Sequence, residues 1–280
     1  MNIKDLFKAK KTVITETKTT TITTEEKTTI NEKTQKPFDK VSPQKIGVLD
    51  MVIAFDTTGS MAAYIEAVRK EVAELVPRLF KDNEDLRLGI VAFGDYCDMN
   101  NAQDFGDAYQ CLMPTNNEND LIKFIRESKD TSGGDGDEFY ELVIKKIVEE
   151  TPWREGSTRA ILLISDAEPH PLGYTYKDYV VGNQIDWRKE ASKAAEMKIK
   201  IDTVTITDNP WYKELSKMTN GISVPFASGH KTARLVETAT MARGSMESRI
   251  KFDKLFDECK DEEFHNVFAS YKDERDRCNI

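Results

Sequence analysis

The sequence is poor in the residues that most often bind transition metals, with only three His and four Cys among 280 residues. The cysteines form no CxxC pair and show no spacing typical of zinc ligands; they lie at positions 97, 111, 259 and 278. A zinc site therefore has little to build on. In a reducing compartment we expect free thiols, and a disulfide between Cys97 and Cys111 is the alternative.

A long apolar run is also missing. No stretch approaches the roughly 20 apolar residues that a membrane-spanning helix needs, and the opening MNIKDLFKAKK lacks the apolar core of a secretory signal. We therefore expect a cytoplasmic protein with no membrane partner. The net charge of −9 argues against a nucleic-acid partner held by phosphate contacts. That charge is uneven, because residues 1–47 carry +4 and the remainder carries −13.

The N-terminal segment has few residues that could build a core. Residues 12–34 contain eleven Thr and almost no bulky apolar side chain. Such a composition cannot offset the entropy cost of ordering, so residues 1–45 are predicted to be a disordered arm and linker. Because Thr is β-branched, the arm could instead add as a strand to another chain. That alternative would make the protein a self-assembling structural subunit.

From Ile46 onward, short apolar segments alternate with segments of helical periodicity, which is typical of a parallel sheet with helices on both faces. The expected strands are residues 46–55, 86–95, 109–114, 158–165, 199–207 and 221–227. The expected helices are residues 61–81, 118–128, 138–150, 187–198, 210–219 and 230–243. The sequence thus predicts a doubly wound α/β domain over residues 46–243. Residues 244–280 read as a pair of amphipathic helices, which either pack on the domain or form a docking surface.

Acids and small hydroxyls follow the central strands of this predicted sheet. The strand VIAF ends at Asp56 in the segment DTTGSM, and ILLIS ends at Asp166. Parallel strands place their carboxyl ends along one rim, where ligands bind. The D-x-T-x-S spacing can turn Thr58 and Ser60 toward the same point as Asp56. A Gly-rich turn, SGGDGDE, adds Asp135.

Oxygen donors alone are the ligand set of Mg²⁺, Mn²⁺ or Ca²⁺ rather than of zinc. The sequence therefore predicts a divalent metal site with five ligands: Asp56, Thr58, Ser60, Asp135 and Asp166. The alternative is that the first three residues only cap the following helix, which Asp, Thr and Ser often do.

The segments DTTGSM, GGDGDE and LLISDAEPH, in this order on these strands, resemble a von Willebrand factor type A (vWA) domain with a metal-ion-dependent adhesion site. The segments VAFGDYCD and SDAEPHPLGY are more similar to the subgroup found in α-kinase-associated and bacterial intracellular proteins. The resemblance covers residues 46–243. It implies a Rossmann-like fold, direct coordination by Thr58 and Ser60, and Asp56 and Asp166 as direct or water-mediated ligands. It also implies a protein partner, and an AAA+ ATPase is one such partner for intracellular domains of this type.

Asp135 departs from the family pattern, because it stands where a threonine is usual. A third carboxylate would raise the local charge to −3. That charge is expected to strengthen cation binding and to weaken the attraction for an acidic group of the partner. We therefore expect a partly structural ion, or a partner that supplies a neutral or water-mediated ligand.

Further polar residues are expected on the same rim. Asp95 and Asp98, with two other acids in the segment GDYCDMNNAQDFGDAY, are candidates to contact basic groups of a partner, and a solvated acidic loop is the alternative. His170 is a candidate proton carrier or partner contact, or else a residue that packs the loop. Asp137 and Glu138 are expected to begin a helix, where acids complement the dipole.

These features predict a non-enzymatic, metal-dependent protein-binding module. A magnesium phosphohydrolase of the haloacid dehalogenase type is the enzymatic alternative. It is disfavoured because Thr58 stands where that type has its general acid.

Overall fold

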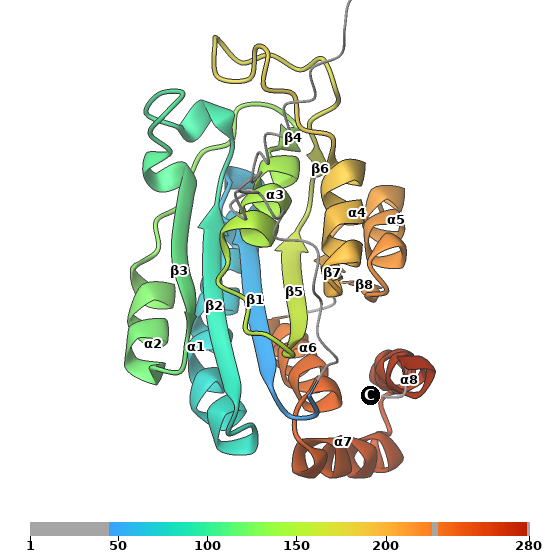
Figure 1. Ribbon diagram of the computed structural model, residues 1–280. Helices are drawn as coiled ribbons and strands as arrows, with labels where there is room; N and C mark the ends of the chain where they lie inside the picture. The colour runs from blue at the N-terminus through green and yellow to red at the C-terminus, as the bar shows by residue number, and fades with distance from the viewer. Residues whose placement is uncertain (1–44, 226–228, 279–280) are drawn as a thin grey trace, which may run out of the picture. The chain divides into compact units, whose positions relative to one another are not determined.

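The structure is a computed structural model that describes residues 45–225 and 229–278 (Figure 1). The predictions for the N-terminal arm lie outside the described residues. Over the two described ranges, the chain belongs to one compact unit. No helix in these ranges is long and apolar enough to cross a membrane.

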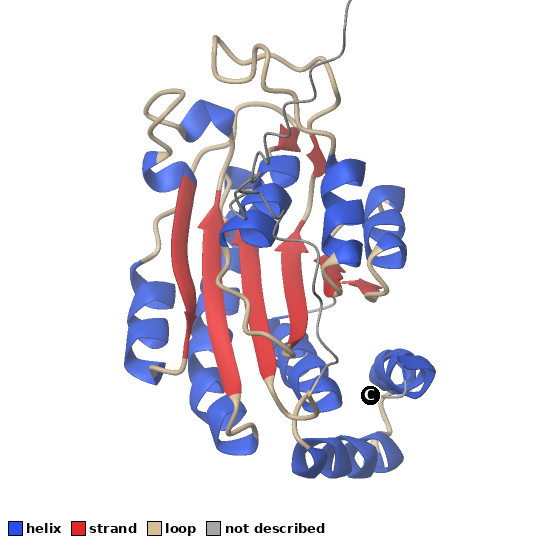
Figure 2. Cartoon of the chain, in the orientation of Figure 1, coloured by secondary structure: helices blue, strands red, loops and turns tan. Residues whose placement is uncertain are grey.

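The core of the domain is a six-stranded sheet in the order β3-β2-β1-β5-β7-β8 (Figure 2). Its strands are β1 (Leu49–Asp56), β2 (Leu86–Phe93), β3 (Tyr109–Thr115), β5 (Thr158–Ser165), β7 (Ile199–Thr205) and β8 (Ser223–Pro225). All neighbours pair in parallel except β3, which is an antiparallel edge strand. The doubly wound α/β fold expected from the sequence is confirmed.

Helices cover both faces of the sheet, as the alternating pattern predicted. One face carries α1 (Ala62–Asp82), α2 (Glu118–Glu127) and α6 (Gly229–Arg243). Their apolar residues form one hydrophobic cluster with every second side chain of β1, from Leu49 to Phe55. The other face carries α3 (Tyr140–Glu150), α4 (Trp187–Glu196) and α5 (Pro210–Met218), which form a second cluster. Figure 1 shows the second set in front of the sheet. Because β1 lies between the two clusters, all eight of its residues are buried.

The C-terminal segment forms the expected pair of helices, α7 (Met246–Glu258) and α8 (Glu262–Cys278). A buried ion-pair cluster attaches α8 to the sheet. Arg243, at the end of α6, contacts both Asp202 of β7 and Glu274 of α8, and Lys200 also contacts Glu274. Tyr271 donates a hydrogen bond to Asp202 over 3.0 Å. Packing on the domain is therefore the observed arrangement of this helix pair.

A second, two-stranded sheet lies beside the rim. Its strands are β4 (Asp137–Glu138) and β6 (Glu168–Pro169), which pair in parallel. The expectation that Asp137 and Glu138 begin a helix is wrong, because α3 starts only at Tyr140. Backbone pairing with β6 holds these two acids in an extended conformation. The short sheet also joins the Gly-rich turn to the segment that follows β5.

Candidate metal site

The site begins at Asp56, the last residue of β1, whose side chain is 0% exposed. Both the backbone N–H and the Oγ1 hydroxyl of Thr58 donate to Asp56 Oδ1, over 2.8 and 2.7 Å. The Thr58 side chain makes no capping bond to the short helix that follows. The helix-capping alternative therefore does not account for the Thr58 hydroxyl, which is turned toward the acid.

The hydroxyls continue this series toward the neighbouring strand. Thr58 Oγ1 lies 3.2 Å from Ser60 Oγ, and Ser60 Oγ donates to Asp166 Oδ1 over 3.2 Å. Phe55 pairs with Ile164 across β1 and β5, which brings the ends of both strands to the same rim. The structure thus brings together four of the five predicted ligands, from two loops more than 100 residues apart in sequence.

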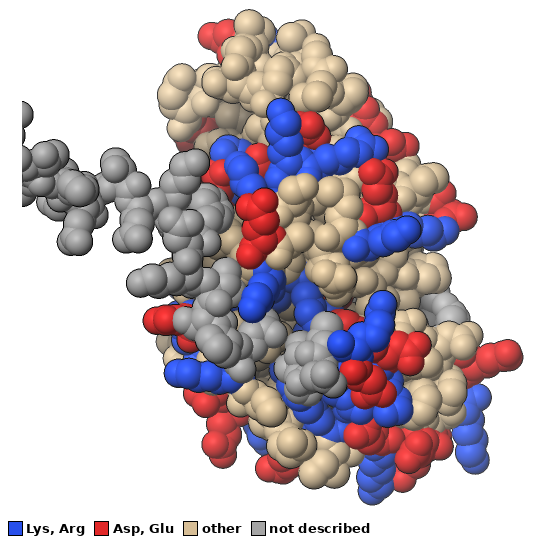
Figure 3. Space-filling view, turned by 45° about the vertical axis from the view of Figure 1, so that its right-hand side comes forward, with Lys and Arg blue, Asp and Glu red and all other residues tan. Residues whose placement is uncertain are grey.

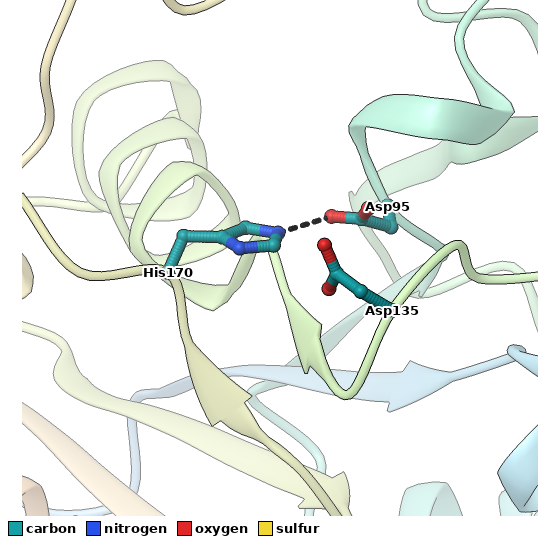
Figure 4. A group of neighbouring side chains, drawn as sticks. All are labelled: Asp95, Asp135 and His170. Atoms are coloured by element: carbon teal, nitrogen blue, oxygen red, sulfur yellow. Dashed lines mark hydrogen bonds and ion pairs between the residues drawn. The ribbon is translucent and has the colours of Figure 1, made fainter. Parts of the chain in front are cut away.

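Asp135 lies elsewhere. Its exposed side chain accepts hydrogen bonds from the Asp137 backbone N–H and the Tyr174 hydroxyl, over 3.1 and 3.3 Å. It groups with Asp95 and His170, and one ligand atom of each lies within 4.8 Å of the others (Figure 4). The structure therefore does not place Asp135 in the series that joins Asp56 to Asp166.

Glu138, from the same Gly-rich segment, is the third carboxylate beside Asp56. Its side chain is 3% exposed, and its Oε2 atom has no hydrogen-bond partner within the described part of the chain. Burial, together with the nearby Asp56 charge, raises the pKa of Glu138 to about 10, although a hydrogen bond with the Thr58 side chain opposes the rise. Gly133 makes room for it, because a side chain there would lie 2.7 Å from Glu138 Oε1. Gly133 also has a φ of +67°, which favours glycine.

The pKa values of these acids indicate whether the site favours a bound cation. Burial raises the pKa of Asp56 to about 6, and burial also raises that of Asp166. Three carboxylates thus share a poorly solvated rim, and one buried oxygen has no partner. A divalent cation bound by oxygen ligands would relieve both features. The residues present therefore fit such an ion.

Residues 50–239, more than half of the chain, match the von Willebrand factor type A domain. The chain belongs to the vWA family. It is also similar to "Alpha-protein kinase vwkA" of Dictyostelium discoideum, with 27% identity over 130 residues. That match covers 45% of this chain and 19% of the kinase.

Tyr140, the first residue of α3, completes the surroundings of Asp56 in this vWA domain. Its hydroxyl donates to Asp56 Oδ2 over 2.5 Å, and it accepts a bond from the Ala167 N–H over 3.3 Å. Its buried ring stacks on Trp211 with centroids 5.4 Å apart. Sequence reasoning missed this residue. The signal was an aromatic pair, Phe139 and Tyr140, at the start of a helix that directly follows the Gly-rich turn.

Asp98 holds the Gly-rich segment in place. Its two carboxylate oxygens accept the backbone N–H groups of Ser132 and Gly133, over 2.9 and 3.1 Å. The Gly59 N–H, on the metal-site loop, donates to the Ser132 carbonyl over 3.2 Å. Asp98, expected on a partner-binding surface, is therefore engaged inside the chain and links the loops of the vWA rim.

Asp95 and His170 are buried, with exposed fractions of 0% and 4%, and His170 Nε2 lies 2.6 Å from Asp95 Oδ1. The imidazole stacks on Tyr174, with ring centroids 3.7 Å apart. Burial acts to lower the pKa of His170, but the hydrogen bond and charge of Asp95 outweigh it and raise the pKa. This burial keeps both residues, expected as partner contacts, away from the surface of the vWA domain.

The described cysteines are free thiols, namely Cys97, Cys111 and Cys259. Burial, with the charges of Asp98 and Asp95, raises the pKa of Cys97 to about 12. Cys97 is therefore a thiol at neutral pH, and its environment is unlike that of a reactive cysteine.

Proposed function

We propose that this vWA domain is a divalent-metal-dependent protein-binding module without catalytic activity of its own. The observation that carries the proposal is the hydrogen-bonded series from Asp56 through Thr58 and Ser60 to Asp166, with the unpartnered oxygen of Glu138 beside it. These residues would hold Mg²⁺, or Mn²⁺ or Ca²⁺, because all their donors are oxygens. The rim at the carboxyl ends of the strands is where α/β sheets bind ligands.

The charge balance bears on what the partner offers. Glu138, with its pKa of about 10, ionises at neutral pH only when a bound cation displaces its proton. Asp56, Asp166 and Glu138 would then together carry −3, which exceeds the charge of one divalent ion. An excess of negative charge weakens the attraction for a further carboxylate. The partner is therefore expected to approach with a neutral or water-mediated ligand. The sequence led to the same expectation through Asp135, whereas the geometry supports it through Glu138.

A binding role is also favoured over hydrolysis. Thr58 stands two residues after Asp56, where a phosphohydrolase of the haloacid dehalogenase type carries a general acid, and its hydroxyl donates to Asp56 itself. The kinase relative adds no enzymatic argument, because the match covers only 19% of that protein. We propose an adaptor that acts in the cytoplasm, for which an AAA+ ATPase is one suitable partner class.

The test combines a metal requirement with a ligand variant. Full-length protein is immobilised and exposed to cell extract in Mg²⁺ or in a chelator, in parallel with Ser60→Ala and the control Ser192→Ala on the exposed face of α4. A partner that wild type and Ser192→Ala retain only with Mg²⁺, and that Ser60→Ala does not retain, supports the proposal. Retention by Ser60→Ala or in chelator contradicts it. If the wild-type protein hydrolyses a phosphate ester only with Mg²⁺, and Ser60→Ala abolishes this activity, the protein is an enzyme instead.

A further inference from the structure

A second group of metal-ligand types lies next to the proposed metal site. Asp95 lies two residues after the end of β2, and His170 is the first residue after β6. Asp135 lies on the Gly-rich segment between them in sequence. Their ligand atoms lie within 4.8 Å of one another, and Figure 4 shows the three side chains pointing toward a common centre. Three separate loops thus deliver two carboxylates and one imidazole to one point.

The group has an unsatisfied buried atom of its own. Asp95 is fully buried, and its Oδ2 atom has no hydrogen-bond partner within the described ranges, while its Oδ1 atom lies 2.6 Å from His170 Nε2. A buried carboxylate oxygen without a partner is costly, and native proteins seldom leave one without a partner. The buried Asp95 oxygen is therefore an acceptor that a bound cation would satisfy.

The donor set differs from that of the proposed magnesium site. Imidazole nitrogen favours borderline ions such as Zn²⁺, whereas Mg²⁺ and Ca²⁺ prefer oxygen alone. Zinc accepts His nitrogen and carboxylate oxygen together, and sites with three protein ligands keep a further position open. The sequence hid this combination, because its three His are scattered and no zinc-ligand spacing links them.

We propose that Asp95, Asp135 and His170 form a second cation site, selective for a zinc-class divalent ion. Both carboxylates and the imidazole bind the ion, which displaces the proton between Asp95 and His170 into solvent. This site shares no ligand with the first one, since none of its three ligands belongs to the series between Asp56 and Asp166.

Metal-stripped full-length protein is titrated with Zn²⁺ by calorimetry in the presence of saturating Mg²⁺. Wild type is expected to bind one Zn²⁺. His170→Gln and Asp135→Asn are expected to weaken its affinity by about 100-fold, since loss of a group that only hydrogen-bonds to a metal ligand already costs 10–100-fold. Two matched controls, His265→Gln on α8 and Asp107→Asn in an exposed turn, are expected to retain wild-type affinity. Ser60→Ala is expected to keep Zn²⁺ binding while it loses Mg²⁺ binding, which separates the two proposals.

The proposal is overturned if wild type shows no Zn²⁺ binding, or if His170→Gln and Asp135→Asn bind it as wild type does. In either case the group is an ion pair that closes the loops. Circular dichroism checks the fold of each variant. If buried His170→Gln does not fold, Asp135→Asn decides alone, because the Asp135 side chain is exposed and its replacement leaves the core intact.

Discussion

At the scale of single residues, the position of Asp56 depends on hydrogen bonds to both of its oxygens. Thr58 supplies two donors to Oδ1, and Tyr140 supplies one to Oδ2. Buried acids are tolerated only when such bonds are present. Asp56 is therefore held in one orientation by its own loop and by the first residue of α3.

Tyr140→Phe removes the hydroxyl that donates to Asp56 Oδ2, for which the described residues offer no other donor, and leaves that oxygen buried. We expect the free energy of unfolding to fall by about 1–3 kcal/mol, the usual cost of such an orphaned group. Urea unfolding of the metal-stripped protein measures it. Tyr179→Phe is the matched control, because its hydroxyl makes only a 3.4 Å bond to the Asn100 carbonyl. Equal losses in the two variants would contradict this account of Asp56.

The meeting of four of the five proposed metal ligands could be predicted, because strand ends and a fixed D-x-T-x-S spacing determine where they lie. Asp56 and Asp166 follow neighbouring parallel strands, so their meeting depends only on the sheet. The fifth position lies on a Gly-rich segment, whose path depends on distant hydrogen bonds to Asp98. Sequence reasoning chose Asp135, whereas the structure places Glu138 beside Asp56.

At the scale of elements, the Gly-rich segment connects the two proposed ion sites. Asp135 and Glu138 lie three residues apart on it, and each faces a different cluster. Its conformation is set from outside, by Asp98 and by the pairing of β4 with β6. Two-residue strands such as these carry no periodic pattern, which is why the small sheet could not be predicted.

Asp98→Ala is expected to lower the free energy of unfolding by about 3–6 kcal/mol, because two hydrogen bonds to a charged group are lost and each contributes roughly 1.5–3 kcal/mol. It should also weaken Mg²⁺ binding, since the segment that positions Glu138 is released. Chemical unfolding and magnesium titration measure the two effects. Asp104→Ala, which removes acceptors only within an exposed turn, is the control. Wild-type Mg²⁺ affinity in Asp98→Ala would show that the segment does not position Glu138.

The attachment of α8 should depend on pH through Glu274. Burial acts to raise the pKa of Glu274, but Arg243 and Lys200 outweigh it and hold that pKa below its ordinary value of 4.5. Such an acid contributes stability that is present above its unfolded pKa and lost as pH falls through the folded pKa. We expect wild type to lose this contribution below about pH 4.5, whereas Glu274→Gln should be less stable at pH 7 and lack this acid-dependent loss. Unfolding curves between pH 3 and 7 measure it, and parallel pH profiles would contradict the expectation.

At the scale of the whole described unit, the central sheet brings the residues of the proposed metal site together. Its order places β1, β2 and β5 side by side, so loops distant in sequence end at one rim. The face in Figure 3 carries intermingled basic and acidic side chains. The alternation of buried strands and helices was readable from the sequence because each element buries its own apolar face.

Metal binding should stabilise the unit as a whole, because the unfolded chain does not assemble these ligands. At a Mg²⁺ concentration 100-fold above the dissociation constant, the gain is about 2.7 kcal/mol. Thermal unfolding with Mg²⁺ and with chelator measures it, with Ser192→Ala as the control that should respond as wild type does. An identical melting temperature in both conditions would mean that the folded protein does not bind the ion preferentially.

The most direct test of the central claim is a calorimetric Mg²⁺ titration of metal-stripped protein that compares Glu138→Gln with Asp135→Asn. The geometry predicts that wild type and Asp135→Asn bind Mg²⁺ with similar affinity, and that Glu138→Gln and Ser60→Ala bind it much more weakly. If wild type binds no Mg²⁺, or if Asp135→Asn loses binding while Glu138→Gln retains it, the site described here is wrong.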